Sequence, residues 1–237
     1  MVNVSLICAV VMLLPAHGVA PVFPVPFDSR MGEVLGGRVG EIIVVRHGQT
    51  EWSRSGQHTG LTDLPLLPDG EEDGRRLRPV LAQRQITHAF VSPLVRARRT
   101  AELAGLIDGE VRSSIDPDLV EVDYGAYEGR TTREISADLG RPWSLWADGT
   151  VPGESAGESL EQVAERVDRV LAKVRPLLAD GDVALVAHGH VLRILTARWL
   201  GLGPEAGALF PLSTGRYGVL GTEHSWAALT GWNTGCP

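Results

Sequence analysis

Two histidines in this chain each follow a short apolar run, and each precedes a glycine. The first run, Ile-Ile-Val-Val, leads into Arg46, His47 and Gly48, and the second, Val-Ala-Leu-Val-Ala, leads into His188 and Gly189. An imidazole is a nucleophile and a proton carrier near neutral pH, and a guanidinium binds phosphate or carboxylate oxygens in pairs. These residue types point to the binding and chemistry of an anionic group, with phosphate as the leading candidate.

A metal site is the main alternative for paired histidines. His188 and His190 are close enough in sequence to share a metal ion, but no nearby carboxylate or cysteine completes a ligand set. We therefore expect that the protein needs no metal and no other cofactor.

The apolar runs also predict the elements that position these residues. Continuous apolar segments at 42–45, 88–92 and 183–187 are typical of parallel strands covered on both faces. Helices are predicted near 70–83, 93–105, 158–178 and 191–202, and further strands near 111–115, 217–222 and 226–230. This alternation predicts a single-domain three-layer α/β/α sandwich with a mostly parallel sheet.

The helix predicted over 158–178 has a clear apolar face. That face consists of Leu160, Val163, Val167, Val170, Leu171 and Val174. The spacing predicts that this helix packs against the sheet.

A second helix, predicted over 93–105, carries three nearby arginines. Ser92 offers it an N-cap and Pro93 a first-turn proline. Arg98 lies roughly 200° around the helix from Arg96, so the two should not face the same pocket. We expect Arg96 to face the ligand and Arg98 to face solvent.

Ligands of open α/β sheets bind beyond the carboxyl ends of the strands. Arg46, His47, Arg96 and His188 should therefore meet at one sheet edge and surround one anion. Gly48 and Gly189 would let the main chain approach that anion closely. We also expect the helix that begins near His190 to aim main-chain N–H groups at it.

Composition narrows the partners. The net charge of −7 argues against general affinity for nucleic acid or anionic membranes, although a local basic pocket is compatible with it. The two cysteines, Cys8 and Cys236, form no disulfide framework, which favours a reducing, cytoplasmic location. We expect a small-molecule phosphate ester as partner and no stable membrane association; homo-oligomer formation is left open.

The first forty residues differ from the rest of the chain. Residues 4–14 are apolar and residues 1–27 contain no Lys, Arg, Asp or Glu. A signal peptide would have such an apolar core, but its positively charged start is missing, and the run is short for a membrane span. We favour an extension over 1–40 outside the fold, with Met31 as an alternative start, and a domain over 41–237. Export by a signal peptide is the second interpretation, and a membrane anchor is the third.

Four ordered blocks resemble the signatures of the histidine phosphatase superfamily, whose fold is called phosphoglycerate mutase-like. VVRHGQTEWS contains Arg46 and His47, and SPLVRARRTAEL contains Arg96. LVEVDYGAYEG contains Glu121, and VAHGHVLRIL contains His188. The resemblance covers about residues 41–232 and implies a phosphoglycerate mutase-like fold.

The resemblance also implies a role for each of these residues. His47 would attack phosphorus and form a phosphohistidine. Arg46, Arg96 and His188 would hold the phosphoryl oxygens, and Glu121 would protonate the leaving oxygen and then activate water. Two neighbouring carboxylates, Asp123 and Glu128, are rival acids, which the alignment of the block disfavours.

Within the superfamily, the sequence favours a phosphatase over a cofactor-dependent phosphoglycerate mutase. The segment 130–187 between the acid and the second histidine is shorter than is usual in the mutases, and Ser53 stands where they usually have Asn. GQTEWSRSGQHTGLTDLPL, DYGAYEGRTTREI and WSLWADG look similar to the sedoheptulose-1,7-bisphosphatase-like subgroup. This similarity implies a sugar phosphate or sugar bisphosphate substrate. A non-catalytic phospho-ligand binder is a further alternative, disfavoured because His47 and Glu121 are both present.

A distal pocket is expected beside the phosphate site. Its polar lining would read sugar hydroxyls or a second phosphate, although an ordinary loop role is as well supported for each residue. The candidate substrate-binding residues are Gly48, Ser53, Gln57, His58, Thr59, Gly60, Tyr124 and Gly189.

Overall fold

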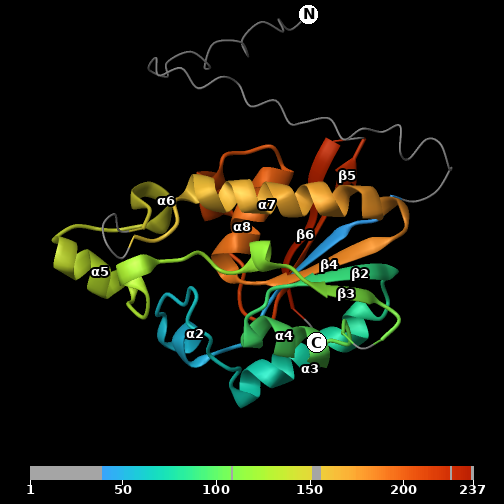
Figure 1. Cartoon of the computed structure of the whole chain (residues 1–237), viewed down its shortest axis with the longest axis horizontal. Coiled ribbons are helices and arrows are strands. Elements are labelled where there is room, and N and C mark those ends of the chain that lie inside the picture. Colours follow the sequence, from blue (N-terminus) through green and yellow to red (C-terminus); the bar gives the residue numbers. More distant parts are fainter. Residues whose placement is uncertain (1–38, 108, 151–155, 225, 236–237) are drawn as a thin grey trace, which may run out of the picture.

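A computed structural model describes residues 39–107, 109–150, 156–224 and 226–235. Its centre is a six-stranded sheet in the order β3-β2-β4-β1-β5-β6 (Figure 1). The strands are β1 (Ile42–Arg46), β2 (Ile86–Val91), β3 (Arg112–Ile115), β4 (Asp182–Ala187), β5 (Tyr217–Glu223) and β6 (Trp226–Thr234). The four strands β3, β2, β4 and β1 run parallel, whereas β5 and β6 pair antiparallel at one side. The predicted mostly parallel sheet is confirmed.

Helices cover both faces of this sheet (Figure 1). The α-helices are α2 (Glu51–Ser55), α3 (Pro68–Leu81), α4 (Val95–Leu103), α5 (Thr132–Leu139), α6 (Leu145–Asp148), α7 (Leu160–Val174) and α8 (Gly189–Trp199). Short 3-10 helices are η1 (Pro117–Leu119), η2 (Gly125–Tyr127), η3 (Arg175–Ala179) and η4 (Pro204–Leu209). The predicted three-layer α/β/α sandwich is confirmed.

The alternation of side chains along β1 explains the two apolar layers. Ile42 and Val44 pack in the cluster that includes α7 and α8, whereas Ile43 and Val45 pack in the cluster that includes α3 and α4. Successive residues of a strand point to opposite faces, so a strand buried on both faces is apolar throughout. All four side chains have no exposed surface, and burial of each contributes roughly 1.5–3 kcal/mol.

Helix α7 has the apolar face that its sequence predicts, but it is shorter than expected. Its six predicted face residues are all buried. Ser159 is its N-cap and forms a capping box with Gln162. The α-helix ends at Val174 and the chain continues as η3, because Pro176 has no N–H for the helical ladder.

The predicted cap of α4 is wrong. The helix begins at Val95 with Leu94 as N-cap residue, and Ser92 makes no cap there. A carboxylate from a distant loop binds the first N–H instead, since the main-chain nitrogen of Val95 donates to Asp63 Oδ1 over 2.8 Å. Ser92 has a partner in the site described below.

The predicted extension over 1–40 lies almost wholly outside the described residues, as do Cys8 and Cys236, so that boundary and the cytoplasmic location stay predictions. Within the described ranges, no helix is both long and apolar enough to cross a bilayer.

Candidate active site

The two histidine-glycine pairs meet at one edge of the sheet. β1 and β4 are neighbours in parallel register, with Arg46 opposite Ala187, so the residues that follow them leave the sheet together. The main-chain nitrogen of His47 donates to the carbonyl of Ala187 over 3.0 Å. The two imidazole rings lie 5.1 Å apart between centroids, with their planes inclined by 58°. The sheet thus places both histidines at one point.

The His47 ring is held in one tautomer. Its Nδ1 lies 2.7 Å from the carbonyl oxygen of Gly48. A carbonyl only accepts, so Nδ1 carries the proton and Nε2 keeps a free lone pair. Burial, together with the charges of Arg46 and Arg96, holds the pKa of His47 well below its usual range. The hydrogen bond to Gly48 raises this pKa, but its effect is smaller. A neutral imidazole with an open Nε2 is suited to nucleophilic attack.

The His188 ring has the opposite tautomer. Arg96 Nε donates to His188 Nδ1 over 3.0 Å. A guanidinium only donates, so His188 carries its proton on Nε2, which lies 2.7 Å from Ser92 Oγ. Burial, with a smaller effect of the Arg96 charge, lowers the pKa of His188 well below its usual value. His188 is therefore a neutral ring whose one N–H is directed at Ser92 Oγ, with no lone pair left for attack.

The two arginines bring largely buried guanidinium groups to the histidines. Arg46 Nη1 donates to the carbonyl of Leu212 over 2.6 Å, while its buried Nε has no hydrogen-bond partner among the described residues. Arg96 Nη1 and Nη2 donate to the carbonyls of Thr62 and Gly60, each over 2.8 Å. Arg96 Nη2 also donates to the carbonyl of Thr59 over 3.4 Å, whereas Nη1 of each arginine has a second proton. An unmet buried donor costs about 1–3 kcal/mol, so an anionic oxygen that bonded to Arg46 Nε would remove this cost.

Burial lowers the pKa of both Arg46 and Arg96. Among the charges that raise these two pKa values, the negative charge of Glu121 has the largest effect. Arg98 is exposed on the opposite side of α4, as the helical phase predicts. The structure therefore brings Arg96, and not Arg98, to the histidines.

The Glu121 carboxylate occupies the start of α8. Its Oε1 accepts from the main-chain nitrogens of Val122 and Val191, over 3.0 and 2.9 Å, and its Oε2 accepts from that of His190 over 3.0 Å. Our expectation that this helix aims its N–H groups at the substrate anion is therefore wrong, because Glu121 itself takes two of them. One lone pair of Oε2 remains for a proton.

The rival carboxylates have local partners. Glu128 accepts from the main-chain nitrogens of Gly60, Leu61 and Thr62, and thereby shapes the loop that also binds Arg96. Asp123 Oδ1 accepts from the nitrogen of Gly125 within its own turn.

Several of the predicted distal residues have local structural partners in place of an open pocket position. Ser53 forms a capping box with Thr50 at the start of α2. Gln57 Nε2 donates to the carbonyl of Gly129 over 2.7 Å, and Thr59 Oγ1 donates to the carbonyl of Gln57 over 3.4 Å. Two predicted glycines are sites of close packing, since a Cβ on Gly48 would lie 2.0 Å from Gly70 O and one on Gly60 would lie 2.6 Å from Val122 O.

His58 and Tyr124 join an aromatic cluster beside the Glu121 carboxylate. Their ring centroids are 4.9 Å apart, and Tyr124 Oη lies 2.5 Å from His190 Nδ1. Trp143 lies 5.2 Å from His58, and Trp146 lies 5.2 Å from His190. We call His58, Tyr124, Trp143, Trp146 and His190 the aromatic cluster.

Gly189, which was also predicted to bind substrate, packs against the Arg46 guanidinium. A Cβ on Gly189 would lie 3.1 Å from Arg46 Cζ.

Sequence reasoning missed Ser92 and the aromatic partners His190, Trp143 and Trp146. Ser92 stands at the start of the block that contains Arg96, and His190 directly follows the second histidine-glycine pair. Their positions beside these motifs could have indicated that they lie in the site. Within the described ranges, no group of three or more His, Cys, Asp or Glu side chains could hold a metal ion. The metal-free chemistry stays a prediction.

Comparison with known proteins identifies the family. The family model of the histidine phosphatase superfamily, branch 1, matches residues 42–235. The chain is 43% identical to sedoheptulose 1,7-bisphosphatase of Saccharomyces cerevisiae over 189 residues, covering 69% of this chain and 68% of that protein. It is 35% identical to an acid phosphatase of Mycobacterium tuberculosis over 192 residues, covering 80% and 90%.

Structures and more distant relatives agree with this family. The solved structure of a mycobacterial glucosyl-3-phosphoglycerate phosphatase superposes with a TM-score of 0.71 at 30% identity, covering 82% of this chain and 99% of that one. A probable phosphoglycerate mutase of Photorhabdus laumondii is 30% identical over 193 residues, covering 81% and 89%. The chain belongs to the histidine phosphatase superfamily and is a phosphatase.

Proposed function

We propose that this phosphatase hydrolyses a small phosphate monoester through a phosphohistidine on His47. The observation that carries the proposal is the hydrogen bond from His47 Nδ1 to the carbonyl of Gly48, over 2.7 Å. That bond directs the lone pair of a neutral ring outward at Nε2, beside the buried cations Arg46 and Arg96.

In the first step, His47 Nε2 attacks phosphorus in line with the ester oxygen. The P–N bond forms as the P–O ester bond breaks, and the leaving oxygen takes the proton that Glu121 carries on Oε2. Arg46 and the remaining proton of Arg96 Nη1 hold the phosphoryl oxygens, and the Nε2–H of His188 joins them by exchanging Ser92 Oγ for a phosphoryl oxygen. Removing one such donor typically costs about 10²–10³ in rate.

In the second step, water attacks the phosphohistidine. Glu121, now a carboxylate, takes a proton from the water, the new P–O bond forms, and the P–N electron pair returns to Nε2. Phosphate leaves, and Glu121 is again protonated. General acid-base assistance of this kind is typically worth about 10²–10⁴ in rate.

We propose a sugar phosphate or sugar bisphosphate as the substrate. The relative of highest identity among those described above is named for sedoheptulose 1,7-bisphosphate. The partly exposed members of the aromatic cluster, His58, Trp146 and His190, set ring faces and polar ring atoms near Glu121, where the leaving group must lie. Ligand sites commonly combine such faces with a few orienting polar groups.

The test is a panel of phosphate esters assayed for release of phosphate and for transfer of the phosphoryl group to a different hydroxyl of the same molecule. It contains sedoheptulose 1,7-bisphosphate, fructose 1,6-bisphosphate and 3-phosphoglycerate. We expect phosphate release, strongest for a sugar phosphate and unchanged by EDTA. Loss of activity with EDTA would contradict the metal-free mechanism.

The panel also separates the alternatives. A positional isomer of the ester without free phosphate would identify a mutase. Binding of an ester with neither product would identify a non-catalytic binder. Preference for 3-phosphoglycerate over both sugar bisphosphates would contradict the substrate proposal alone.

A further inference from the structure

The proposed acid, Glu121, lies in a buried segment without regular structure. Residues 121–124 belong to no helix or strand, and Val122 has no exposed surface. Buried main-chain groups need hydrogen-bond partners, and an irregular segment cannot obtain them from a strand or helix of its own. The side chain of Glu121 is held by α8, so a separate device must hold its main chain.

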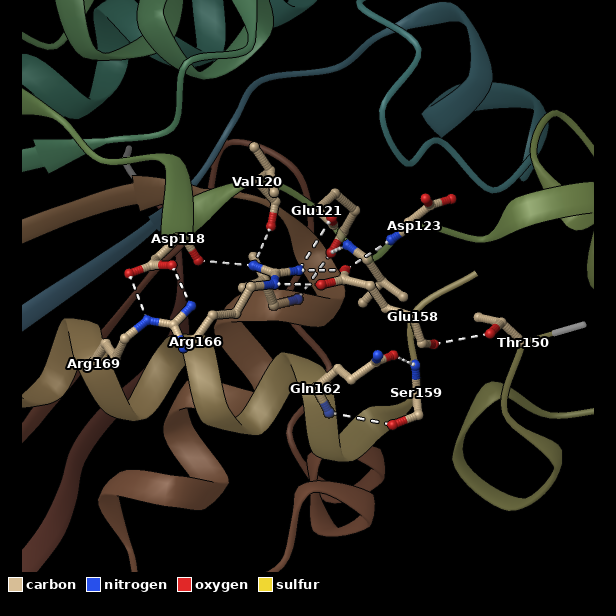
Figure 2. Close-up of polar contacts among 12 residues, drawn as sticks. Asp118, Val120, Glu121, Asp123, Thr150, Glu158, Ser159, Gln162, Arg166 and Arg169 are labelled. Carbon is tan, nitrogen blue, oxygen red and sulfur yellow. Dashed lines mark hydrogen bonds and ion pairs between the residues drawn. The ribbon is translucent and has the colours of Figure 1, made fainter. Parts of the chain in front are cut away.

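Arg166 on α7 provides that device (Figure 2). Its Nη1 donates to the carbonyls of Asp118 and Val120, over 2.8 and 2.7 Å, and its Nη2 donates to the carbonyl of Glu121 over 3.2 Å. Its Nε and Nη2 each donate to Glu158 over 2.9 Å. These contacts use all five donors of a guanidinium, and only 6% of the residue is exposed.

Glu158 completes the attachment from the other end of the segment. Its Oε2 also accepts from the main-chain nitrogen of Asp123 over 3.1 Å, and its own nitrogen donates to the carbonyl of Asp123 over 2.9 Å. The carbonyl of Glu158 accepts from Thr150 Oγ1 over 2.8 Å. Arg166 and Glu158 together hold main-chain groups at 118, 120, 121 and 123, on both sides of the acid.

We infer that Arg166 is a positioning residue for proton transfer by Glu121, with Glu158 as its partner. The inference rests on the proposed role of Glu121 as acid. Arg166 donates to main-chain carbonyls rather than to the Glu121 carboxylate, so it acts through the segment and not on the substrate. α7 fixes the main chain of the acid, α8 fixes its carboxylate, and together they set where Oε2 lies.

The planar guanidinium of Arg166 is needed to bind the main-chain carbonyls and Glu158 at the same time. An ammonium has three donors at one point and cannot bridge three carbonyls and a carboxylate. Arg166→Lys therefore keeps the charge and loses the geometry. A small displacement of an acid is costly, because misplacement by about 1 Å can lower a rate about 10²-fold.

Arg169 is a matched control on the same helix. It lies one turn further along α7 and binds the Asp118 carboxylate through Nε and Nη2, over 3.2 and 2.7 Å (Figure 2). Its side chain is 58% exposed, and it binds a side chain rather than the main chain of the acid segment. Arg169→Lys makes the same chemical change without loosening Glu121.

The experiment compares kcat/KM for two esters, p-nitrophenyl phosphate and glycerol 2-phosphate. Nitrophenolate leaves without a proton, whereas an alkoxide needs the acid, so the ratio of the two rates reports proton transfer and not general damage. For Arg166→Lys we expect kcat/KM to fall about 10–100-fold for glycerol 2-phosphate and less than about threefold for p-nitrophenyl phosphate. Arg169→Lys should leave both values within about twofold of wild type.

A double-variant cycle adds a second test. In a Glu121→Gln background there is no acid to position, so Arg166→Lys should leave the ratio of the two rates unchanged. Equal losses on both esters, or independent effects of the two substitutions on that ratio, would overturn the inference. Should Arg166→Lys not fold, Glu158→Gln carries the same test, because it weakens the Arg166 pair and the contact to Asp123.

Failure of the inference is distinguishable from failure of the proposed function. If Glu121→Gln changes the ratio and Arg166→Lys does not, Arg166 is not a positioning residue and the acid role stands. If Glu121→Gln slows both esters equally, the acid role is wrong, and the inference is overturned with it.

Discussion

The two histidine-glycine pairs have the same local sequence pattern and opposite chemistry. Both follow buried parallel strands, β1 and β4, and both reach the same sheet edge with their rings 5.1 Å apart. Yet His47 carries its proton on Nδ1 and offers a lone pair at Nε2, whereas His188 carries its proton on Nε2. In the proposed mechanism, the first ring attacks phosphorus and the second donates its N–H.

The difference comes from the partners and not from the motif. His47 is oriented by the carbonyl of the very next residue. His188 is oriented by Arg96 and Ser92, which lie 92 and 96 positions earlier in the chain. The same short pattern therefore acquires its second role only when the fold brings a distant arginine to it.

The two glycines differ in the same way. A Cβ on Gly48 would lie 2.0 Å from the main-chain oxygen of Gly70, so this glycine allows α3 to pack. The three atoms nearest to a Cβ on Gly189 all belong to the Arg46 guanidinium, the nearest at 3.1 Å. One glycine serves the fold and the other serves the site.

The largest expected effect comes from removal of the proposed nucleophile. His47→Asn should lower turnover by about 10⁴-fold or more, because no other group can form the phosphoenzyme. It should also abolish acid-labile labelling of the protein by a phosphorylated substrate. Labelling that persists in this variant would show that another residue is the nucleophile.

The matched change at the other histidine should have a smaller effect. His188→Asn removes one donor to the phosphoryl group and should lower kcat/KM by about 10²–10³-fold. Acid-labile labelling should persist, because Nε2 of His47 is untouched. Loss of labelling here would mean that the two histidines are not divided between attack and donation.

Alanine at the two glycines should separate stability from activity. Gly48→Ala forces main chain apart and should lower the free energy of unfolding by about 1–3 kcal/mol. Gly189→Ala moves the Arg46 guanidinium by a few tenths of an ångström, and should lower kcat/KM about tenfold with little change in stability. The free energy of unfolding in urea and kcat/KM should be measured for both variants and compared with wild type. Equal loss of stability would contradict the different roles of the glycines.

Much of this fold could be predicted because its strands are buried on both faces. A continuous apolar run as short as residues 42–45 fits best in the middle of a covered sheet, and the charged residue that ends it must lie at the sheet edge. That logic places Arg46, His47, Arg96 and His188 together, and the resemblance adds Glu121.

What could not be predicted depends on long-range contacts. The cap of α4 comes from Asp63, 32 positions before Val95, and so Ser92 is free to bind His188. Likewise, the residues at the start of α8 bind Glu121, which lies 69 and 70 positions away. Local propensity contains no information on such partners, and for this reason the tautomers and the attachment by Arg166 emerge only from the structure.

The smallest predicted effect is one that the two histidines share. Burial lowers the pKa of both rings below the value of about 6.5 expected in the unfolded chain. The unfolded chain therefore binds more protons below that pH, so the stability from these rings is present above about pH 6.5 and is lost as the pH falls. The free energy of unfolding should decrease between pH 6.5 and 5.5 by up to about 1.4 kcal/mol per pH unit for each ring.

Substitution then assigns this slope to each ring. His47→Asn and His188→Asn should each flatten the pH dependence by a similar amount, although their effects on catalysis differ. His224→Asn is the control, since its side chain is 82% exposed and its φ of 47° suits asparagine. Urea unfolding of the three variants across this pH range measures the slopes. A slope as steep in His188→Asn as in wild type would show that the folded protein does not keep this ring neutral, which would contradict the Nδ1 lone pair to which Arg96 donates.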